Sequence, residues 1–564
     1  MNNHYVIHVH DRNYTDYDIF THDEHLVKTD LHIDPVEHKL FHNDVFLLDL
    51  HNKPCIEISE IRSKKNIPGV LVLEHNRTYG RTDNKKRLLY RCIPYDANLP
   101  HFLIPYDINL AFSKCIHNKY VLFSFQNWDS HHPHGVLCES LGDVNTMNAL
   151  AEYELYGHHL QYSLKDMNTH AKKKIKTHTE MIDDICHSNR FKLQHKTDQY
   201  VFSIDPSGST DFDDAFAIQQ TENEYILTVH IANVAIWSEY LDLWSHYSGR
   251  VSSMYLPHCK KPMLPSVLSD QICSLQQKQK NVTMFVEFPI SNDGHIDHER
   301  ITFGNSIVKV CKNFEYEEHR LYTNKHYNTL LDVSKLVDRS ISNSHDVVSC
   351  WMVKVNSYLA KKLANYDIGL LRTSSLRYNQ RMNLGFSRKI CDALFHYHNA
   401  SSNYVSTKFD DLRHVVMDKD IYTHVTSPIR RKVDLLNQLV LLYRCQHVTN
   451  MSSSSQLFII HCMNDLDKIN EQTKNIKYVQ NKLQFIQLCY NNETSFVDEV
   501  QQGIVVDKKL VDTMYHYTIY IDKLCVFLPA ILDNELQEHT YCDVRVFLFE
   551  DENNVRNKVK IQIL

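Results

Sequence analysis

The sequence IDPSGSTDFDDA, residues 204–215, places four aspartates within ten residues: Asp205, Asp211, Asp213 and Asp214. No residue of this segment is basic, so the charge that neutralises the carboxylates has to come from outside it. A hard divalent cation is the simplest source. Oxygen-rich clusters suit Mg²⁺ or Mn²⁺, which keep open positions for water and phosphate. The segment therefore predicts metal-assisted chemistry on a phosphate, with the four aspartates as metal ligands.

Two other interpretations of this segment are a solvated acidic turn and a calcium loop of the EF-hand type. The calcium loop fails on spacing, because the sixth residue counted from Asp205 is Thr210 rather than glycine and the twelfth is Phe216 rather than glutamate. The solvated turn stays open on composition alone. The flanking residues 200–204 and 225–231 have the pattern of strands. We therefore expect carboxylates that are held at the end of a buried strand.

A second charged element, TSPIRR at residues 426–431, is expected to begin a helix. Ser427 is a suitable N-cap, Pro428 fits the first helical position, and apolar residues then recur along one face. Arg430 and Arg431 would lie in the first turn, where the helix dipole disfavours cations. A bound phosphate would compensate for their charge. A salt bridge to a nearby carboxylate is the alternative, and both hold if Arg430 faces the aspartates.

The composition of the whole chain limits the class of protein. The chain has 564 residues, a net charge of −7 and 43% hydrophobic residues. This length predicts about three to five domains with packed cores. The charge excludes a protein that coats nucleic acid over its whole surface, although a locally basic channel stays compatible with it. The 15 cysteines are irregularly spaced, which favours reduced thiols and a cytoplasmic location. They include no C-x-x-C unit, which argues against a structural zinc site built on that unit.

The pattern of apolar segments and turn residues along the chain predicts its domain boundaries. Residues 1–75 and 76–150 carry short apolar segments between turn residues, which predicts two small β-barrels. We expect a helical linker over residues 151–189 and a mixed α/β domain, with both charged elements, over residues 190–450. Residues 498–564 alternate apolar and polar side chains as in a third barrel.

Three further local patterns carry expectations. Residues 451–497 should contain a linker, marked by the four serines Ser452–Ser455, and a helix. An amphipathic helix is predicted where apolar residues recur at spacings of four, three, four and four, and its apolar face is expected to pack in the core; its residues are Val348, Met352, Val355, Leu359 and Leu363. No apolar run approaches the ~20 residues that cross a membrane, so no membrane partner is expected.

Four blocks of sequence resemble the RNase II/RNase R (RNB) family of exoribonucleases, which includes the catalytic subunit of the exosome. In chain order they are DPSGSTDFDDA at 205–215, HIANV at 230–234, YLP…PMLP…LS…CSL between 255 and 275, and YTHVTSPIRRKVDL at 422–435. A weaker match, CIP…LP…PHG between 92 and 135, looks like the second cold-shock barrel of the exosome branch.

This resemblance implies a fold and a reaction. The fold is multidomain α+β, with a central RNB-type α/β catalytic domain at residues 190–450. OB-fold barrels flank it: two are N-terminal and cold-shock-like, and one is C-terminal and binds RNA. The reaction is hydrolytic and processive 3′→5′ degradation of single-stranded RNA to nucleoside 5′-monophosphates, by a monomer with no further protein partner identified.

The resemblance also implies roles for individual residues. The four aspartates would bind Mg²⁺, with Mn²⁺ as a substitute, and the ions would activate water and stabilise the leaving oxygen. Arg430 would neutralise charge that develops on the scissile phosphate. Arg431 would hold the RNA backbone or the aspartate cluster. Tyr255 would stack on a base near the 3′ end.

The chain departs from the family pattern at three places. Asn233 stands where the family has aspartate, at a position we expect to be structural. Residues 371–374 replace an aromatic-Arg-x-His segment, and Asn437-Gln438 replaces His-Arg. None of these departures touches the aspartate cluster, so activity is expected to survive. The alternative function is a catalytically weak RNA-binding scaffold that keeps the fold. A different two-metal phosphoryl transferase is a third option, but the chain has no Gly-rich triphosphate loop.

Overall fold

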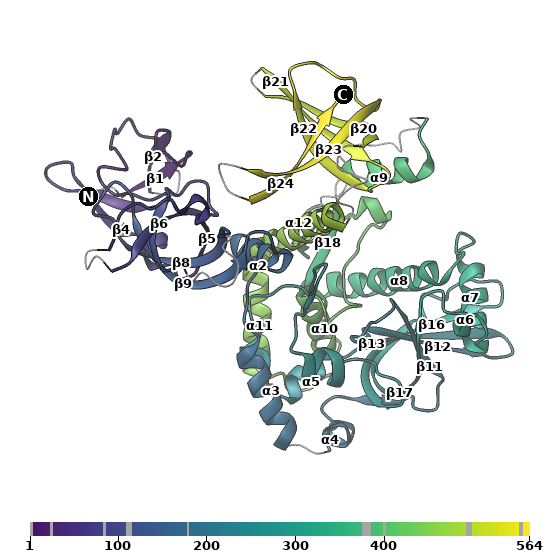
Figure 1. The fold of residues 1–564 in the computed structure, drawn as a ribbon. Coiled ribbons are helices and arrows are strands. Elements are labelled where there is room, and N and C mark those ends of the chain that lie inside the picture. Colours follow the sequence, from purple (N-terminus) through teal and green to yellow (C-terminus); the bar gives the residue numbers. More distant parts are fainter. Residues whose placement is uncertain are drawn as a thin grey trace. The chain divides into compact units, whose positions relative to one another are not determined.

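The computed structural model describes residues 4–22, 26–82, 86–108, 116–177, 180–374, 385–398, 402–491, 499–551 and 556–564. The chain divides into two compact units, each described by itself below (Figure 1). The first unit contains Met1–Gln161, Leu256–His258 and Tyr478–Leu564, and the second contains Tyr162–Tyr255 and Cys259–Lys477. Sheets and helices are mixed throughout, which confirms the predicted multidomain α+β class.

The N-terminal part of the first unit consists of two sheets. One has four antiparallel strands in the order β2-β1-β3-β4, and the other is a closed barrel in the order β5-β6-β7-β9-β8. Aromatic rings pack between them: Phe41 stacks on Phe102 with ring centroids 5.9 Å apart and also contacts Trp128. The elements are β1 (Tyr5–Val9), β2 (Tyr17–Thr21), β3 (Val45–Leu48), β4 (Pro54–Ile58), α1 (Glu60–Ser63), β5 (Ile67–Leu71), η1 (Glu74–Asn76), β6 (Leu88–Pro94), β7 (Phe102–Tyr106), β8 (Lys119–Asn127), β9 (His134–Asp143) and α2 (Met147–Gly157).

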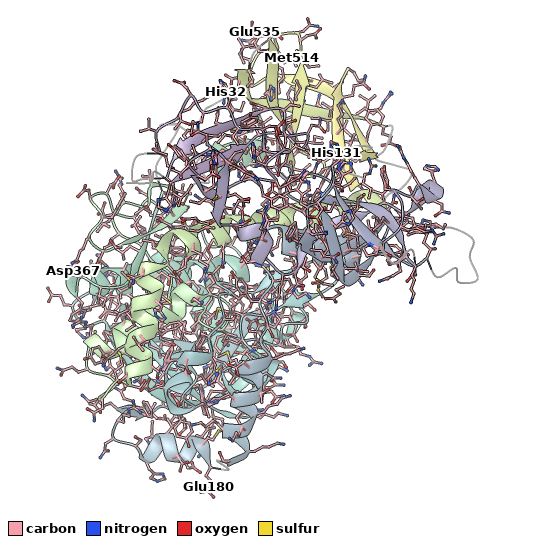
Figure 2. All side chains as sticks on the ribbon, turned by 90° about the vertical axis from the view of Figure 1, so that its left-hand side faces the viewer. His32, His131, Glu180, Asp367, Met514 and Glu535 are labelled. Atoms are coloured by element: carbon pink, nitrogen blue, oxygen red, sulfur yellow. The ribbon has the colours of Figure 1, made fainter. Side chains whose placement is uncertain are left out.

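The C-terminal part of the first unit is a five-stranded antiparallel sheet in the order β22-β21-β20-β23-β24. Tyr517 and Tyr520 are buried in it, so core packing is the role of these two rings. Figure 2 shows Met514 and Glu535 at the outer edge of this sheet. Its strands are β20 (Val500–Val511), β21 (Met514–Ile521), β22 (Val526–Leu532), β23 (Tyr541–Asp551) and β24 (Arg556–Ile563).

The second unit is built on a six-stranded sheet in the order β10-β17-β11-β12-β13-β16. β11 lies parallel to β17 and antiparallel to β12, and β16 returns to pair with β17. The strands expected around the aspartates are present as β11 and β13. The strands are β10 (Leu193–His195), β11 (Val201–Asp205), β12 (Asp214–Gln220), β13 (Glu224–Ala232), β16 (Lys280–Ser291) and β17 (Thr302–Glu315).

Helices and short hairpins complete the second unit. The predicted amphipathic helix is α8, which begins with a capping box between Asn343 and Asp346 and buries Trp351 against α7, where its Nε1–H donates to Ser334 Oγ at 2.8 Å. Among the helices described, none combines the length and apolar character needed to cross a bilayer. The remaining elements are α3 (Lys165–Thr177), α4 (Met181–His187), α5 (Val234–Tyr240), η2 (Trp244–His246), β14 (Met254–Tyr255), β15 (Lys260–Lys261), η3 (Val267–Ile272), α6 (His319–Tyr322), α7 (Lys325–Val337), α8 (Ser344–Asn365), β18 (Leu370–Ser374), α9 (Arg388–His398), β19 (Ser402–Ser406), η4 (Val415–Met417), α10 (Lys432–Arg444), α11 (Ser453–Asn464) and α12 (Leu466–Asn491), whose residues from Tyr478 onward belong to the first unit.

The structure moves one predicted boundary. The division between the first two barrels was expected at residue 75, but β5 belongs to the closed barrel, where Gly69 pairs with Pro94 of β6 and with Val121 of β8. The boundary therefore lies between β4 and β5. The position of this boundary depends on the pairing of β5 with strands later in the chain, and the turn residues near position 75 give no information about that pairing.

The linker predicted at the four serines is wrong, because these residues begin α11. Ser452 is the N-cap, and its Oγ accepts a hydrogen bond from the Ser455 N–H at 3.2 Å. Ser452 is held in turn by Glu239, whose carboxylate accepts hydrogen bonds from the serine N–H and Oγ. Serine is common both in linkers and at helix N-caps, and the hydrogen bonds to the buried Glu239 show that Ser452 is an N-cap.

Removing the cap should loosen the start of α11. In Ser452→Ala the Ser455 N–H loses its acceptor, so amide hydrogen exchange in the first turn of α11 should be faster. The free energy of local opening that this exchange measures should fall by about 1 kcal/mol. Ser453→Ala, one residue further on, is the matched control and should leave exchange unchanged. Equal protection in the wild type and Ser452→Ala would contradict the capping role.

Candidate active site

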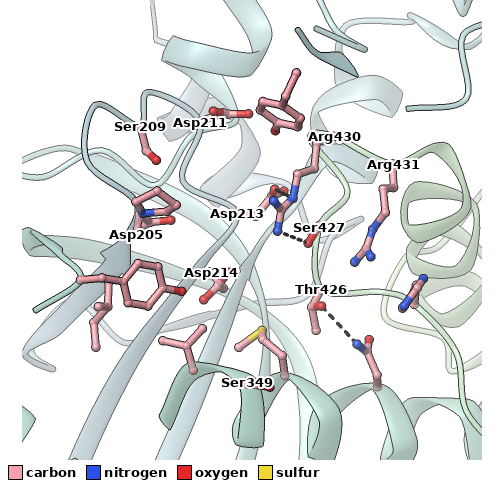
Figure 3. Close-up of a pocket in the computed structure, with 18 of the residues that line it drawn as sticks. Asp205, Ser209, Asp211, Asp213, Asp214, Ser349, Thr426, Ser427, Arg430 and Arg431 are labelled. Carbon is pink, nitrogen blue, oxygen red and sulfur yellow. Dashed lines mark hydrogen bonds and ion pairs between the residues drawn. The ribbon is translucent and has the colours of Figure 1, made fainter. Parts of the chain in front are cut away.

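A cavity of about 610 Å³ in the second unit collects the predicted site residues. Its walls come from the end of β11, the loop before β12, the β14–β15 hairpin, α8 and residues 422–431. All four aspartates, both arginines and Tyr255 line it (Figure 3). The two charged sequence elements, more than two hundred residues apart, therefore share one site, as their spacing alone could not show.

Asp205 and Asp214 lie at the ends of neighbouring strands. Asp205 is the last residue of β11 and Asp214 the first residue of β12. Because these strands are antiparallel, the end of one and the start of the other meet at the same edge of the sheet. Figure 3 shows both carboxylates facing the same part of the cavity. Each has a buried Oδ2 atom that accepts no hydrogen bond within the described part of the chain.

The two carboxylates are in an environment that favours their neutral form. Burial raises the pKa of Asp205 to about 7, and the negative charge of Asp213 adds to this effect. Burial also raises the pKa of Asp214 to about 8, with the charge of Asp205 adding to it. A nearby cation would reverse this preference, since it stabilises the ionised carboxylates.

Asp213 joins the two sequence elements directly. Its side chain is buried, its Oδ1 accepts a hydrogen bond from the Ile429 N–H at 2.9 Å, and its Oδ2 lies 3.3 Å from Nε of Arg430. Its own backbone oxygen accepts from the Ala232 N–H at the end of β13. Burial raises the pKa of Asp213 to about 7, although Arg430 and the Ile429 N–H oppose the shift.

Asp211 has a cationic partner that the sequence analysis missed. Lys260 Nζ lies 2.5 Å from Asp211 Oδ1, and the same ammonium lies 5.9 Å from the centre of the Tyr255 ring. Lys260 reaches this position because β15 pairs with β14, which places it opposite Tyr255. Two of the four aspartates, Asp211 and Asp213, are therefore already paired with cationic side chains of the chain itself.

The residues present fit a magnesium ion held by Asp205 and Asp214. With Asp211 and Asp213 paired, Asp205 and Asp214 are the two carboxylates of the cluster that have no ion pair among the described residues, and each has an unpartnered buried oxygen. Within the described ranges no three His, Cys, Asp or Glu side chains converge as a ready-made metal cage. Mg²⁺ does not need such a cage, because it commonly binds through one or two carboxylates and completes its shell with water and phosphate oxygens.

The helix predicted to begin at Ser427 begins later. α10 starts at Lys432 with Arg431 as its N-cap, so Arg430 and Arg431 precede the helix instead of occupying its first turn. Residues 428–430 form a single turn, in which Ser427 O accepts hydrogen bonds from the Arg430 and Arg431 N–H groups, and the backbone becomes extended at Arg431. Arg431 pairs with Ser252 in an isolated bridge, where the Ser253 N–H donates to Arg430 O and the Lys432 N–H donates to Val251 O. The long-range pairing at Arg431 separates this single turn from α10, so the helix-dipole argument for a phosphate at the arginines does not hold.

The two arginines have different partners. Arg430 reaches Asp213, and its Nη2–H donates to Ser427 Oγ at 3.2 Å; its side chain is nevertheless 45% exposed. Arg431 Nη2 lies 2.8 Å from Asp434 Oδ1, which also accepts a hydrogen bond from the Ser427 N–H. The charge of Arg431 is therefore paired with a carboxylate outside the aspartate cluster. Figure 3 shows Arg430 beside Asp213 and Arg431 farther from the aspartates, although both arginines line the cavity.

Aromatic side chains line the cavity beside the charges. Tyr255 is 41% exposed, so its ring is accessible for stacking. Tyr316 stacks on His345 with centroids 3.7 Å apart, and its N–H donates to Asp205 O. The sequence analysis missed Tyr316, because its position depends on the parallel pairing of β17 with β11.

The predicted amphipathic helix also contributes to the cavity, although only core packing was expected of it. Val348 and Met352 of α8 line the wall. His424 lines another part, with Nδ1 2.8 Å from the Tyr404 hydroxyl. Burial holds the pKa of His424 well below its usual value, and the charges of Arg431 and Arg372 add to this, so the ring is neutral.

The departures from the family pattern are structural at three positions. Asn233 is buried and caps α5, accepting a hydrogen bond from the Ile236 N–H at 3.1 Å. Asn437 is buried and donates to Leu370 O and Thr423 Oγ1, while Gln438 Nε2–H donates to Ala232 O. The amides of Asn437 and Gln438 join α10 to Leu370 of β18, to Thr423 and to the end of β13. At these positions the chain uses uncharged side chains for packing.

Comparisons with known proteins find a family domain in the second unit and relatives of low sequence identity. Residues 194–329 match the RNB domain family. The chain is 25% identical over 313 residues to Ribonuclease R of Chlamydia pneumoniae, covering 42% of this chain and 46% of that protein. It is 26% identical over 308 residues to DIS3-like exonuclease 2 of Xenopus tropicalis, covering 52% of this chain and 35% of that protein. The matched parts thus span less than half the length of either relative.

Two solved structures show the same fold. Mycoplasma genitalium RNase R in complex with ribose-methylated single-stranded RNA superposes with a TM-score of 0.70 at 15% identity, over 99% of this chain and 100% of that chain. Yeast Ssd1, described as a pseudonuclease, superposes with a TM-score of 0.58 at 14% identity, over 93% of this chain and 78% of that chain. The fold is therefore shared by a nuclease and by a protein named for lacking that activity.

The raised pKa values predict a stability that falls with pH unless a cation is added. In the unfolded chain Asp205 and Asp214 ionise near 3.8, whereas in the folded chain they hold protons up to about 7 and 8. Between about pH 4 and 8 the folded state binds more protons, so the free energy of unfolding decreases as pH rises through this window. The melting temperature in chelator should be lower at pH 8 than at pH 6, and Mg²⁺ should raise it more at pH 8.

The matched variants for this measurement are Asp214→Asn and Asp198→Asn, the second changing an exposed aspartate outside the cavity. Asp214→Asn should reduce both the pH dependence and the Mg²⁺ effect, while Asp198→Asn should behave as wild type. A melting temperature that is insensitive to Mg²⁺ at both pH values would exclude a metal site at these carboxylates.

Proposed function

Because this chain belongs to the RNB family, we propose that it is a hydrolytic, processive 3′→5′ exoribonuclease that degrades single-stranded RNA to nucleoside 5′-monophosphates. The proposal includes Mg²⁺ as the cofactor, with Mn²⁺ as a substitute, and a cytoplasmic monomer as the active form. One observation carries it: four aspartates and Arg430 line a single cavity, and two of the carboxylates keep unpartnered buried oxygens.

The proposed roles follow from the partners of each residue. Asp205 and Asp214 would hold the metal, while Asp213 would keep Arg430 in place through the contact between its Oδ2 and Nε. When bound, Mg²⁺ supplies an acidified water and stabilises charge on phosphate oxygens. Arg430, partly exposed toward the cavity, would donate its remaining N–H groups to the phosphate as negative charge develops.

The remaining groups of the cavity would position the RNA. The exposed ring of Tyr255 would stack on a base, and Lys260 beside it would lie close to the sugar-phosphate backbone while paired with Asp211. Arg431 would act indirectly, because its pairing with Asp434 fixes the segment that carries Arg430.

The alternative is an RNA-binding scaffold without catalysis. The structural similarity to a pseudonuclease supports considering it, since the fold by itself does not require activity. Clustered carboxylates cost stability when nothing neutralises them. All four aspartates, with the arginine, are present here, and their retention favours the enzyme.

The enzyme and the scaffold differ in one assay. Wild type incubated with 5′-labelled single-stranded RNA and Mg²⁺ should shorten it from the 3′ end, and chelator should stop the reaction. Asp213→Asn keeps an acceptor for the Ile429 N–H but leaves Arg430 without its carboxylate, so shortening should slow by on the order of 10²-fold or more. Asp198→Asn is the control and should be fully active. RNA that is retained but never shortened by wild type would establish the scaffold.

Replacing the arginine by lysine tests the geometry of its guanidinium. Arg430→Lys keeps a positive charge but cannot pair with Asp213 and donate to a phosphate at the same time, so kcat should fall by on the order of 10²-fold while the affinity for RNA changes little. Arg444→Lys, at the exposed end of α10, is the matched control. A kcat for Arg430→Lys within a factor of two of wild type would show that the charge alone is sufficient.

A further inference from the structure

A second cavity, of about 600 Å³, lies in the same unit as the acidic cavity and shares no lining residue with it. Its walls come from β16, the hairpin that follows β16, the C-terminal half of α8 and residues 418–421. Its size falls in the range of sites for small organic ligands. None of the function proposed above uses this cavity.

α8 separates the two cavities by its two faces. Val348 and Met352, one turn apart, face the acidic cavity. Lys354, Tyr358 and Lys361 follow at spacings of four and three residues on another face and line the second cavity. A ligand in one cavity therefore does not occupy the other.

One part of the second cavity is apolar and rigid. Phe288, Ile296 and Ile301 are buried beneath it. Tyr358 is held in position because its hydroxyl donates to Ile301 O at 3.0 Å, and Lys362 lies over its ring at 5.4 Å from the centroid. This part offers flat apolar surface of the kind on which an aromatic base packs.

The other part is strongly basic. Four lysines line the cavity, and no ion pair engages any of them within the described residues; they are Lys354, Lys361, Lys362 and Lys419. Two nearby acids are paired with other cations. Asp367, just beyond α8 and labelled in Figure 2, pairs with Lys408 at 3.4 Å, and Asp418 lies 3.5 Å from Arg413. Asp420 is the one lining acid without such a partner among the described residues.

We propose that this cavity is a binding site for a nucleoside 5′-monophosphate. The apolar part with Tyr358 takes the base, and the lysines take the phosphate. A phosphate dianion suits four ammonium groups better than a ligand with a single carboxylate would, because it carries two negative charges. A flat ring joined to a multiply charged phosphate combines both requirements in one molecule. Binding needs neither a metal nor catalysis, so this proposal stands or falls independently of the hydrolysis proposed above.

The test measures binding of 5′-AMP to the full chain by calorimetry, in chelator and without RNA. Wild type should bind 5′-AMP at least tenfold more tightly than either adenosine or inorganic phosphate. The double variant Lys361→Gln/Lys419→Gln should weaken binding by at least tenfold, because each lysine contributes a charge-assisted contact. Ser357→Trp, which fills the cavity without changing its charge, should abolish binding. Lys335→Gln, an exposed lysine of α7 outside both cavities, should bind as wild type.

Other outcomes overturn the proposal in distinct ways. Equal affinity for phosphate and 5′-AMP would identify a simple anion patch, and a 5′-phosphorylated RNA oligonucleotide that binds where 5′-AMP does not would identify an RNA track. Binding that is lost in Asp214→Asn and kept in the lysine double variant would place the nucleotide in the acidic cavity. Melting temperatures near that of wild type would confirm that each variant is folded.

Discussion

The hydrogen bond from the Ile429 N–H to Asp213, together with the contact between that aspartate and Arg430, holds the site together. It joins the loop before β12 to the segment before α10. A buried carboxylate is stable only when its charge is met by donors or cations. Here one backbone amide and one guanidinium meet that need, and by doing so they place Arg430 over the cluster. Without this contact the aspartates and the arginine would belong to separate parts of the second unit.

The balance of charge around the cluster explains how four aspartates can share a loop. Lys260 is paired with Asp211 and Arg430 with Asp213, which leaves Asp205 and Asp214 without an ion pair among the described residues. Burial is the main cause of their raised pKa values, and the charges of neighbouring aspartates add to it: Asp213 acts on Asp205, and Asp205 acts on Asp214. The same two groups have the unpartnered buried oxygens, so the carboxylates whose ionisation the fold disfavours are also the ones best suited to hold a divalent cation. The cost in stability and the proposed catalytic role thus have one physical origin.

α8 gives the second unit two chemically opposite cavities. One is acidic and suits a cation that assists phosphate chemistry, and the other is basic and suits a phosphate itself. Local sequence reasoning assigned the apolar face of this helix to core packing only, because a helical periodicity does not say whether the neighbouring element touches the face along its whole length. The structure shows that Val348 and Met352 lie where packing gives way to open space.

The sequence by itself determined the aspartate cluster, the strands on either side of it, the helix α8 and the mixed α+β class, because each of these depends on residues that are close together in the chain. It did not determine where α10 begins, because the pairing of Arg431 with Ser252 makes the backbone extended at one residue and so separates the turn after Ser427 from the helix. It also did not reveal Lys260 or Tyr316, whose places depend on the pairing of β15 with β14 and of β17 with β11. Tertiary structure alone decided which charges meet, since partners in a buried site are brought together by strand pairing across long stretches of chain.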